Sequence, residues 1–327
     1  MQQRNVEIDI MKGITILCVM LGHTYWLPDM ARTLIHSFHM PLFFLVSGFF
    51  AKTFSDFSGS NKDFLRKNAK QLLIPYLIVA CVSCIYAFVQ SIHYNEFTYV
   101  THKLVRYFFA LDHTWPDTIF DYWVDPIWFL LALFWARLFF FWLSHIGKWF
   151  PLISVILSIV MVFIHPYVPT PFCIGRGIEA LVFLAIGYIY RHFTIPIGAK
   201  IAVIGCWFIS MFLGEIDLCA FQFNCLPLDI LGACGGTLVI YYLSKGIKLT
   251  FLASFFSWCG KNSLIILCSH TIESNMTIVH LATKALPLTI PQIIYFGIKH
   301  TITILGAWIF TISQKCLTQN PNTTYKL

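Results

Sequence analysis

The sequence predicts an all-α polytopic membrane protein, with about ten transmembrane helices in one bundle and both termini in the cytoplasm. Hydrophobic residues make up 58% of its 327 residues and charged residues only 11%, and the mean hydropathy is +0.73. Soluble domains carry about 25% charged residues, so this composition excludes a water-soluble globule. Apolar stretches recur along the whole chain. The organisation of the chain is therefore described by how many of these stretches can cross a bilayer.

Ten apolar stretches approach the length of a membrane crossing, which is about 17 to 25 residues for a helix. The first follows a charged segment and continues into Trp26 and Pro28 without a small-residue cleavage site, so we expect a retained span and not a signal peptide. We expect one integral-membrane domain over residues 1–327, with a short cytoplasmic tail at 315–327 and no appended soluble domain. The predicted spans are 10–28, 34–51, 72–93, 126–144, 149–165, 176–191, 197–213, 227–244, 261–281 and 292–314.

The basic residues are distributed unevenly over the loops between these spans. When the N-terminus is placed in the cytoplasm, fifteen of the 22 lysines and arginines fall on the cytoplasmic side. Lysine and arginine favour cytoplasmic loops, so this distribution supports ten spans with both ends inside. The net charge of +7 therefore reports orientation in the membrane and does not indicate nucleic-acid binding.

The longest loop, residues 94–125, joins the third and fourth spans on the predicted outer side. It is too polar to cross the membrane, and it contains His102, His113 and Trp115. Aromatic rings and hydrogen-bonding groups of this kind suit an interfacial helix or a lid that collects a sugar.

Several ionisable residues lie within the predicted spans, where a charged group costs about 2.5 kcal/mol or more on insertion scales. Lys12 and His23 are eleven positions apart on the first span, so they share one helix face and lie about 16 Å apart along its axis. His39 on the second span lies at a similar depth to His23, and His270 lies about 13 Å into the ninth span. With Glu179 on the sixth span, four spans can present His23, His39, Glu179 and His270 to one cavity.

These residues also have structural interpretations. A single histidine in a membrane helix often serves only as an interhelical hydrogen-bonding group. Arg176 and Glu179 are three positions apart and can pair with each other, and the basic segment 62–70 can be an orientation signal or a contact for anionic lipid. The coincidence of several titratable residues at matching depths favours a functional site.

A set of six segments carries a pattern that resembles the membrane-bound acyltransferase 3 family, and within it the branch of fucose 4-O-acetylases. The family's early motif is a basic residue, ten intervening residues and a histidine, which Lys12 and His23 match. A basic run precedes the third segment, as in the family, and the ordered set covers most of the chain. The segments are Asp9–His23, Ser37–Phe50, Leu72–Tyr76, Ile127–Leu130, Phe183–Tyr188 and Gly260–His270.

The resemblance implies a membrane-embedded O-acetyltransferase. Such an enzyme moves an acetyl group from cytoplasmic acetyl-CoA, its acyl donor and co-substrate, to a hydroxyl of a cell-surface or lipid-linked glycan, here in the cytoplasmic (inner) membrane of a bacterium. The expected partners are acetyl-CoA, the glycan acceptor and the lipid bilayer, without nucleic acid. The resemblance leaves open the acceptor sugar, the length of the acyl group and whether the protein forms a homo-oligomer.

Four basic residues are expected to bind the donor from the cytoplasmic side. Anionic CoA phosphates cannot enter hydrocarbon and need such a basic mouth, which Lys12, Arg66, Lys67 and Lys70 can form. The family often has an arginine pair before the Pro-Tyr of the third span, whereas Arg66, Lys67 and Lys70 fill this region here. Which of them meets the donor is therefore left open.

His23 is the predicted general base for the acceptor hydroxyl, because an imidazole with its unperturbed pKa of about 6.5 titrates near the operating pH. A covalent acetyl-histidine is the alternative. His39 and His270 are expected to orient the base, to stabilise the thioester oxyanion or to bind acceptor hydroxyls. No metal is expected, since no HExxH spacing occurs. The other predicted site residues are Glu179 for catalysis, and Arg176 and Trp128 for substrate binding.

A proton-coupled secondary transporter of a small polar solute or glycan precursor is the competing class. Titratable residues at mid-depth are what such a carrier needs. Against it, the two halves of the sequence show no repeat symmetry and no Gly or Pro breaks at corresponding places.

Overall fold

The computed structural model describes residues 5–24, 27–111, 125–168, 170–214, 216–218, 222–275 and 290–319. Almost all of these residues form helices. In chain order the elements are α1 (Val6–Gly22), α2 (Asp29–His36), α3 (His39–Phe49), α4 (Asn61–Asn68), η1 (Ala69–Leu73), α5 (Ile74–Tyr94), α6 (Thr98–Phe109), α7 (Trp128–Leu143), η2 (Ser144–Ile146), α8 (Phe150–Ile164), η3 (Pro171–Cys173), α9 (Ile174–Glu179), α10 (Leu181–His192), α11 (Ile197–Leu213), β1 (Ile216–Asp217), β2 (Gln222–Phe223), α12 (Leu226–Ile247), α13 (Ala253–Lys261), α14 (Ser263–Asn275) and α16 (Ile290–Gln319).

Each predicted span coincides with a helix or with a broken helix. The second is divided, because α2 ends at His36 and α3 begins at His39. The ninth corresponds to α14, which begins at Ser263 directly after the break at Asn262 that ends α13, and its residues 276–281 lie outside the described part of the chain. At the sixth, the segment Pro171–Glu179 meets α10 at a bend of 44°.

Three helical stretches in the described part of the chain are long and apolar enough to cross a bilayer. They are Asn61–Tyr94, Trp128–Ile146 and Leu226–Ile247, and the bent pair that ends with α10 adds a fourth if it counts as one span. The chain is therefore a helical membrane protein. The crossing of the membrane by all ten stretches and the cytoplasmic position of both termini stay predictions.

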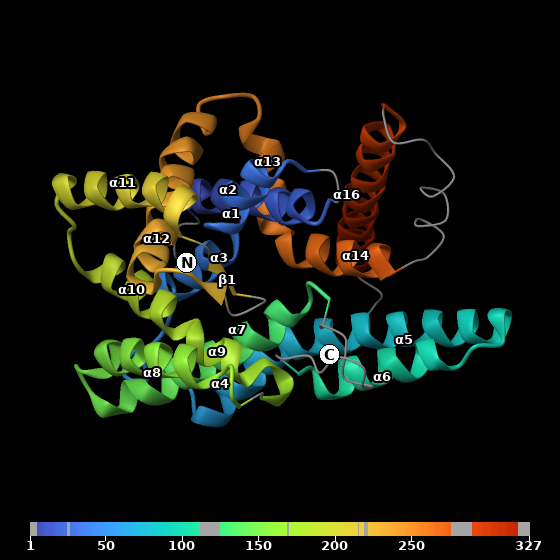
Figure 1. Cartoon of the computed structure of the whole chain (residues 1–327), viewed down its shortest axis with the longest axis horizontal. Helices are drawn as coiled ribbons and strands as arrows, with labels where there is room; N and C mark the ends of the chain where they lie inside the picture. Colours follow the sequence, from blue (N-terminus) through green and yellow to red (C-terminus); the bar gives the residue numbers. More distant parts are fainter. Residues whose placement is uncertain are drawn as a thin grey trace.

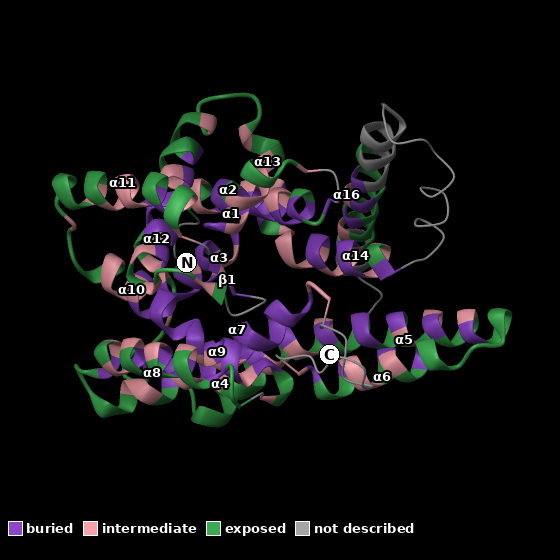
Figure 2. Cartoon of the chain, viewed as in Figure 1, coloured by how far each residue is buried: buried purple, intermediate pink, exposed green. Residues whose placement is uncertain are grey.

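The helices pack as two groups (Figure 1). One group contains α1, α3, α12, α13 and α14, with α11 and α16 at its outside, and the other contains α4 to α9. The two are joined by α10, which packs against both α3 and α8, and by α14, which contacts α5. Burial is concentrated along α7, where eleven of 16 residues are buried, while the far ends of α5 and α6 are exposed (Figure 2). A helix that is apolar on every side is suited to this central position.

Two glycines fix the position of α1 against α13. A side chain on Gly13 would overlap the carbonyl oxygen of Phe256, and a side chain on Gly260 would overlap the carbonyl oxygen of Asp9. The two backbones therefore approach to a distance that only glycine allows, as is common between membrane helices. The side chain of Asn5 caps the start of α1 by accepting hydrogen bonds from backbone N–H groups of its first turn.

Two features lie between the predicted spans. The loop between the third and fourth spans contains α6, a helix the sequence anticipates there, whereas His113 and Trp115 of this loop lie outside the described residues. The loop after α11 contributes the antiparallel pair β1 and β2, in which Asp217 faces Gln222. The sequence gives no signal for these two short strands.

Candidate active site

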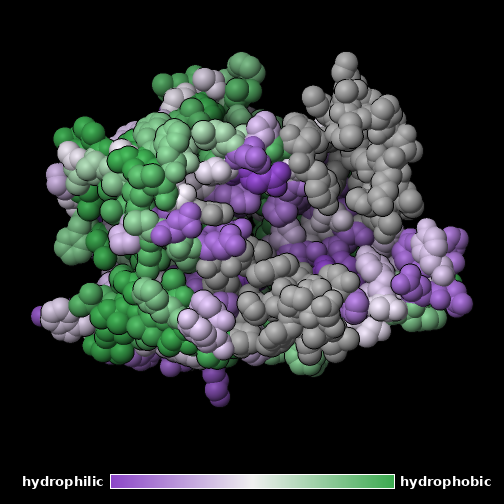
Figure 3. Space-filling view, viewed as in Figure 1, coloured by the Kyte–Doolittle hydropathy of each residue, from purple (hydrophilic) through white to green (hydrophobic). Residues whose placement is uncertain are grey.

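A cavity of about 1170 Å³ lies between the two helix groups. Its walls come from α1, α2, α3, η1, α7, β1 and α14, with single residues from α5 and α6. Hydrophilic residues gather in the hollow between the groups, whereas the outer surface over α8 and α11 is hydrophobic (Figure 3). The ionisable residues that line the cavity are Asp9, Lys12, His23, His36, His39, Lys70, Arg106, Asp125, Arg137 and Asp217.

The structure brings half of the predicted site residues onto this cavity. Lys67 instead lines a neighbouring cavity of about 200 Å³, and Arg66 lies exposed on α4, outside the lining residues of both cavities. Arg176, Glu179 and His270 are buried, each at most 2% exposed, and are not lining residues. Those that line the large cavity are Lys12, His23, His39, Lys70 and Trp128.

His23 caps the C-terminal end of α1, and its imidazole has a defined tautomer. The Nδ1 atom lies 2.8 Å from the carbonyl oxygen of Val19. Because a carbonyl oxygen only accepts hydrogen bonds, Nδ1 carries the proton, which leaves Nε2 as the basic nitrogen of the neutral ring. The backbone of its own helix thus prepares His23 to accept a proton.

The break between α2 and α3 adds two more imidazoles to the same wall. His36 is the last residue of α2 and His39 is the first of α3, and their ring centroids lie 5.1 Å apart. His39 is buried, and its Nδ1 donates to the carbonyl oxygen of Ile35 at 2.8 Å, so it has the same tautomer as His23. His36 packs against Gly22, next to His23.

Two lysines of the predicted donor site line the cavity. Lys12 stands on the second turn of α1, so it lies about 16 Å from His23 along the helix axis. Lys70 belongs to η1, a π-helical turn between α4 and α5. Such turns are rare and occur often at functional sites, because they re-aim the side chains that they carry.

Arg137 on α7 lines both cavities and is not among the predicted site residues. Its Nε donates to Oγ of Ser47 on α3 at 2.8 Å. Lys52 and Lys67 line the smaller cavity beside it. An arginine inside an apolar span is a signal for function, and this signal was present in the sequence.

Trp128 connects the cavity to the buried pair on α9. The guanidinium carbon of Arg176 lies 5.0 Å from the centroid of the Trp128 ring, a cation–π arrangement. Arg176 thus lies behind a residue that lines the cavity, and Glu179 lies one turn further along α9, where its carbonyl oxygen accepts from Ser158 of α8. This cation–π contact places Arg176 where it can hold the Trp128 ring in position.

His270 lies behind His23. The two ring centroids are 5.5 Å apart in an edge-to-face arrangement. His270 is 1% exposed, and its Nδ1 lies 3.6 Å from Oε2 of Glu273, one turn later on α14. On its other side the ring of His300 on α16 lies at 5.6 Å between centroids. His270 is therefore placed to contact His23 from outside the cavity.

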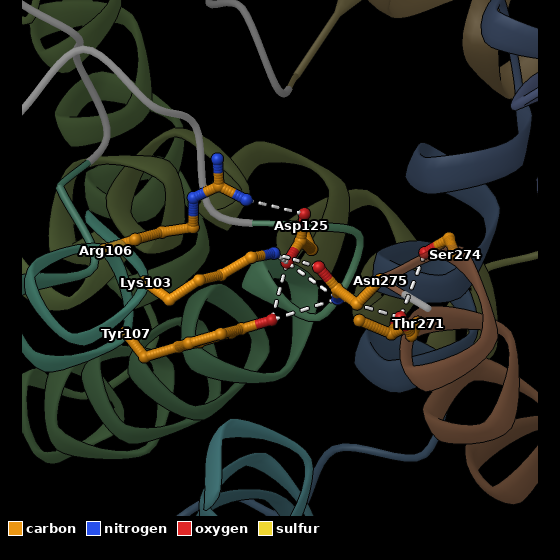
Figure 4. Close-up of polar contacts among 7 residues, drawn as sticks. All are labelled: Lys103, Arg106, Tyr107, Asp125, Thr271, Ser274 and Asn275. Carbon is orange, nitrogen blue, oxygen red and sulfur yellow. Dashed lines mark hydrogen bonds and ion pairs between the residues drawn. The ribbon is translucent and has the colours of Figure 1, made fainter. Parts of the chain in front are cut away.

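A polar network closes the wall where α6, α7 and α14 meet (Figure 4). Asp125 accepts from Arg106 at 2.9 Å and lies 3.4 Å from the ammonium of Lys103. The amide of Asn275 on α14 donates to Asp125 at 2.9 Å, its oxygen accepts from Lys103, and Tyr107 also donates to Asp125. The carboxylate of Asp125, three residues before α7, thus ties α6 to α14, two helices far apart in sequence.

The charge state of Asp125 follows from this network. Burial alone would raise the pKa of its carboxyl, but the nearby cations Lys103 and Arg106, together with the hydrogen bonds from Tyr107 and Asn275, outweigh burial and hold the pKa below its usual value. Asp125 is therefore ionised at neutral pH and balances the two cations beside it.

Comparison with known proteins gives one finding. A family model described as an acyltransferase domain matches residues 5–312, which is nearly the whole chain. Among curated proteins and among solved structures, none matches the chain significantly.

Proposed function

The chain belongs to the acyltransferase 3 family, as its motifs predict, and from this premise we propose that it is an O-acetyltransferase that uses acetyl-CoA to acetylate a glycan hydroxyl. One observation carries the proposal: a continuous cavity joins Lys12 and Lys70 to His23, His36 and His39. Anion-binding groups and proton-accepting groups are what the two substrates of this reaction require. The transporter alternative gains no comparable support.

The donor would enter beside the start of α1. Lys12 and Lys70 are placed to pair with the phosphates of CoA, and Arg137 is placed to bind a phosphate bidentately through its planar guanidinium. The distance of about 16 Å along α1 between Lys12 and His23 is one that the extended pantetheine arm of CoA can largely span. The thioester would then reach the imidazoles.

The acceptor would lie at the histidine end. Nε2 of His23 takes the proton of the acceptor hydroxyl while the oxygen of that hydroxyl attacks the acetyl carbonyl carbon. The carbonyl then re-forms, and CoA leaves as its thiolate. In its neutral form His39 presents Nε2 as an acceptor, because Nδ1 donates to Ile35, so it suits binding a second sugar hydroxyl better than stabilising an oxyanion. Trp128 offers an aromatic face for the sugar ring.

The test is transfer of isotope-labelled acetyl from acetyl-CoA to the envelope glycans of the cells that express the protein. The purified protein is placed in proteoliposomes with an extracted glycan fraction, and mass spectrometry detects acetylated sugars. We expect label in an ester on a sugar, dependent on the protein and absent from His23→Ala. If no glycan fraction receives label and all of it stays in acetyl-CoA, then either acetyl-CoA is not the donor or a glycan is not the acceptor. Longer acyl-CoA donors, tested in parallel, distinguish these two errors.

A further inference from the structure

A cluster of three metal-ligating side chains lies between α14 and α16. His270 and Glu273 stand one turn apart on α14, and His300 comes from α16. One ligand atom from each lies within 4.8 Å of the others. None of the three lines the large cavity.

We propose that His270, Glu273 and His300 bind a divalent transition-metal ion such as Zn²⁺. Two imidazole nitrogens and one carboxylate oxygen form a donor set typical of zinc sites that keep an open coordination position. Ligand atoms at about 2.1 Å from a tetrahedral ion lie about 3.4 Å apart. Small side-chain rotations therefore bring the present arrangement to ligand geometry without a movement of either helix.

The surroundings of the cluster favour an ion. His270 is 1% exposed and His300 is 9% exposed, so the two imidazoles are withdrawn from bulk water. The side chain of Glu273 is 14% exposed, so the third donor lies at the edge of the buried region. Thr303, also on α16, donates to Oε2 of Glu273 at 3.3 Å. A hydrogen bond of this kind orients the carboxylate of a metal site.

The two helices explain why sequence motifs do not reveal this site. Glu273 follows His270 by three positions, but His300 lies 27 positions further along the chain, so no compact spacing appears. The ion would join α14 to α16 and place positive charge one imidazole away from His23, whose ring lies 5.5 Å from that of His270. The site does not depend on the acyl group or on the acceptor.

The experiment measures metal binding to the purified protein without a polyhistidine tag. After removal of metals by a chelator, Zn²⁺ is restored, and the bound metal is counted by inductively coupled plasma mass spectrometry. Co²⁺ serves as a probe, because its visible absorption reports coordination number. We expect one ion per chain, four- or five-coordinate Co²⁺ and a higher melting temperature with Zn²⁺.

Variants assign the ion to these residues. His300→Ala and Glu273→Ala should abolish stoichiometric binding, and Thr303→Val, which keeps all three ligands, should weaken it about 10-fold to 100-fold. His192→Ala is the control, because His192 lies exposed on α10 away from the cluster, and it should bind like the wild type. His23→Ala should also keep the ion.

Two results would overturn the proposal. One is wild-type protein that binds no more Zn²⁺ than one with His270, Glu273 and His300 all replaced. The other is an ion that persists in His300→Ala, which would remove His300 from the ligand set. Because binding is measured without acetyl-CoA, either result leaves the proposed acetyl transfer untouched.

Discussion

An imidazole whose Nδ1–H is already donated to the carbonyl oxygen four residues earlier offers one basic atom to a substrate. His23 and His39 are both held in this way on the cavity wall, by Val19 and by Ile35. A backbone carbonyl, of the same helix for His23 and of the preceding helix for His39, can therefore fix the tautomer of a proton acceptor without a partner side chain. This local geometry was not evident from the sequence, because the spacing that produces it is present in every helical histidine.

We expect His23→Ala to lower acyl transfer about 100-fold to 10,000-fold, the range typical of a lost general base. Donor affinity should change little, because the imidazole lies about 16 Å from Lys12 along α1. The matched control is His192→Ala, since Nδ1 of His192 bonds the carbonyl oxygen of Tyr188 at 2.8 Å in the same way but on α10, away from the cavity. A His23→Ala protein with a tenth or more of wild-type turnover would contradict the assignment.

We expect Arg137→Gln to weaken acetyl-CoA binding about 10-fold to 100-fold, because a hydrogen bond to a charged group contributes about 1.5 to 3 kcal/mol. Arg137→Lys should recover only part of the affinity, since lysine keeps the charge but loses the planar fork. Isothermal titration with CoA gives the affinities. Arg191→Gln is the control, because Arg191 lies exposed on α10 and bonds the carbonyl oxygen of Phe49 outside both cavities. Equal affinities for the two Gln variants would remove Arg137 from the donor site.

At the residue scale, the sequence predicts that Lys12 and His23 share one helix face, because one span carries both, and both line the cavity. Their roles stay predictions. The sequence does not predict the pairing of Arg106 with Asp125 and Asn275, because it arises where α6 and α14 meet, and one sequence does not report which helices are neighbours.

The crossing of α1 and α13 shows how the elements hold the site. We expect Gly13→Ala and Gly260→Ala each to destabilise the protein by about 1 to 3 kcal/mol or more, because the added methyl group must push the backbones of α1 and α13 apart. Thermal unfolding in detergent measures the loss. Gly205→Ala is the control, since its added Cβ meets no atom within 4 Å, and alanine favours a helix over glycine. Equal melting temperatures for all three variants would show that the crossing tolerates a side chain.

The broken helices mark the limit of prediction at the element scale. Apolar content predicts that residues 34–51 lie in the membrane, but it does not report the interruption at Ser37 and Phe38. The sign of this break is Pro41, which cannot donate to the carbonyl of Ser37 four residues earlier and is tolerated because it lies in the first turn of α3. The interruption has a consequence for the site, because it places His36 and His39 side by side. The existence of a helix follows from apolar composition, whereas its continuity must be judged from single residues such as Pro41.

At the scale of the whole molecule, the Asp125 network joins the two helix groups. The folded-state pKa of Asp125 lies below its usual value, so its stabilisation is present above about pH 3.9, the unfolded pKa, and is lost as the pH falls through the folded pKa. We expect Asp125→Asn to lower stability by about 3 kcal/mol at pH 7, because Lys103 loses its charge partner. The difference from wild type should shrink when melting temperatures are measured down to pH 3. A difference that stays constant would show that the ionised carboxylate is not its source.

The last prediction concerns the two sides of the membrane. The charge distribution assigns Arg106, Asp125 and Asp217 to the outer side. In the structure Arg106 and Asp125 pair in the polar network (Figure 4), and Asp217 lines the same cavity. An alternating topology requires such a meeting of outer helix ends. The meeting therefore fits alternating spans. The orientation in which Lys12 and Lys70 face the cytoplasmic pool of CoA stays a prediction.

Labelling of single cysteines in intact cells tests this orientation after removal of the eleven native cysteines. Cysteines at the exposed positions Ser58 and Gly246 should be protected from an impermeant thiol reagent, and those at Glu96 and Tyr167 should react. Ser58 is chosen in place of the nearby Ser60, because Ser60 caps α4 together with Asp63 and its replacement would disturb that helix. Labelling after cell lysis is the control for reactivity. Reaction at Ser58 with protection at Glu96 would place Lys12 and Lys70 on the side without CoA, and the donor assignment would then fail together with the topology.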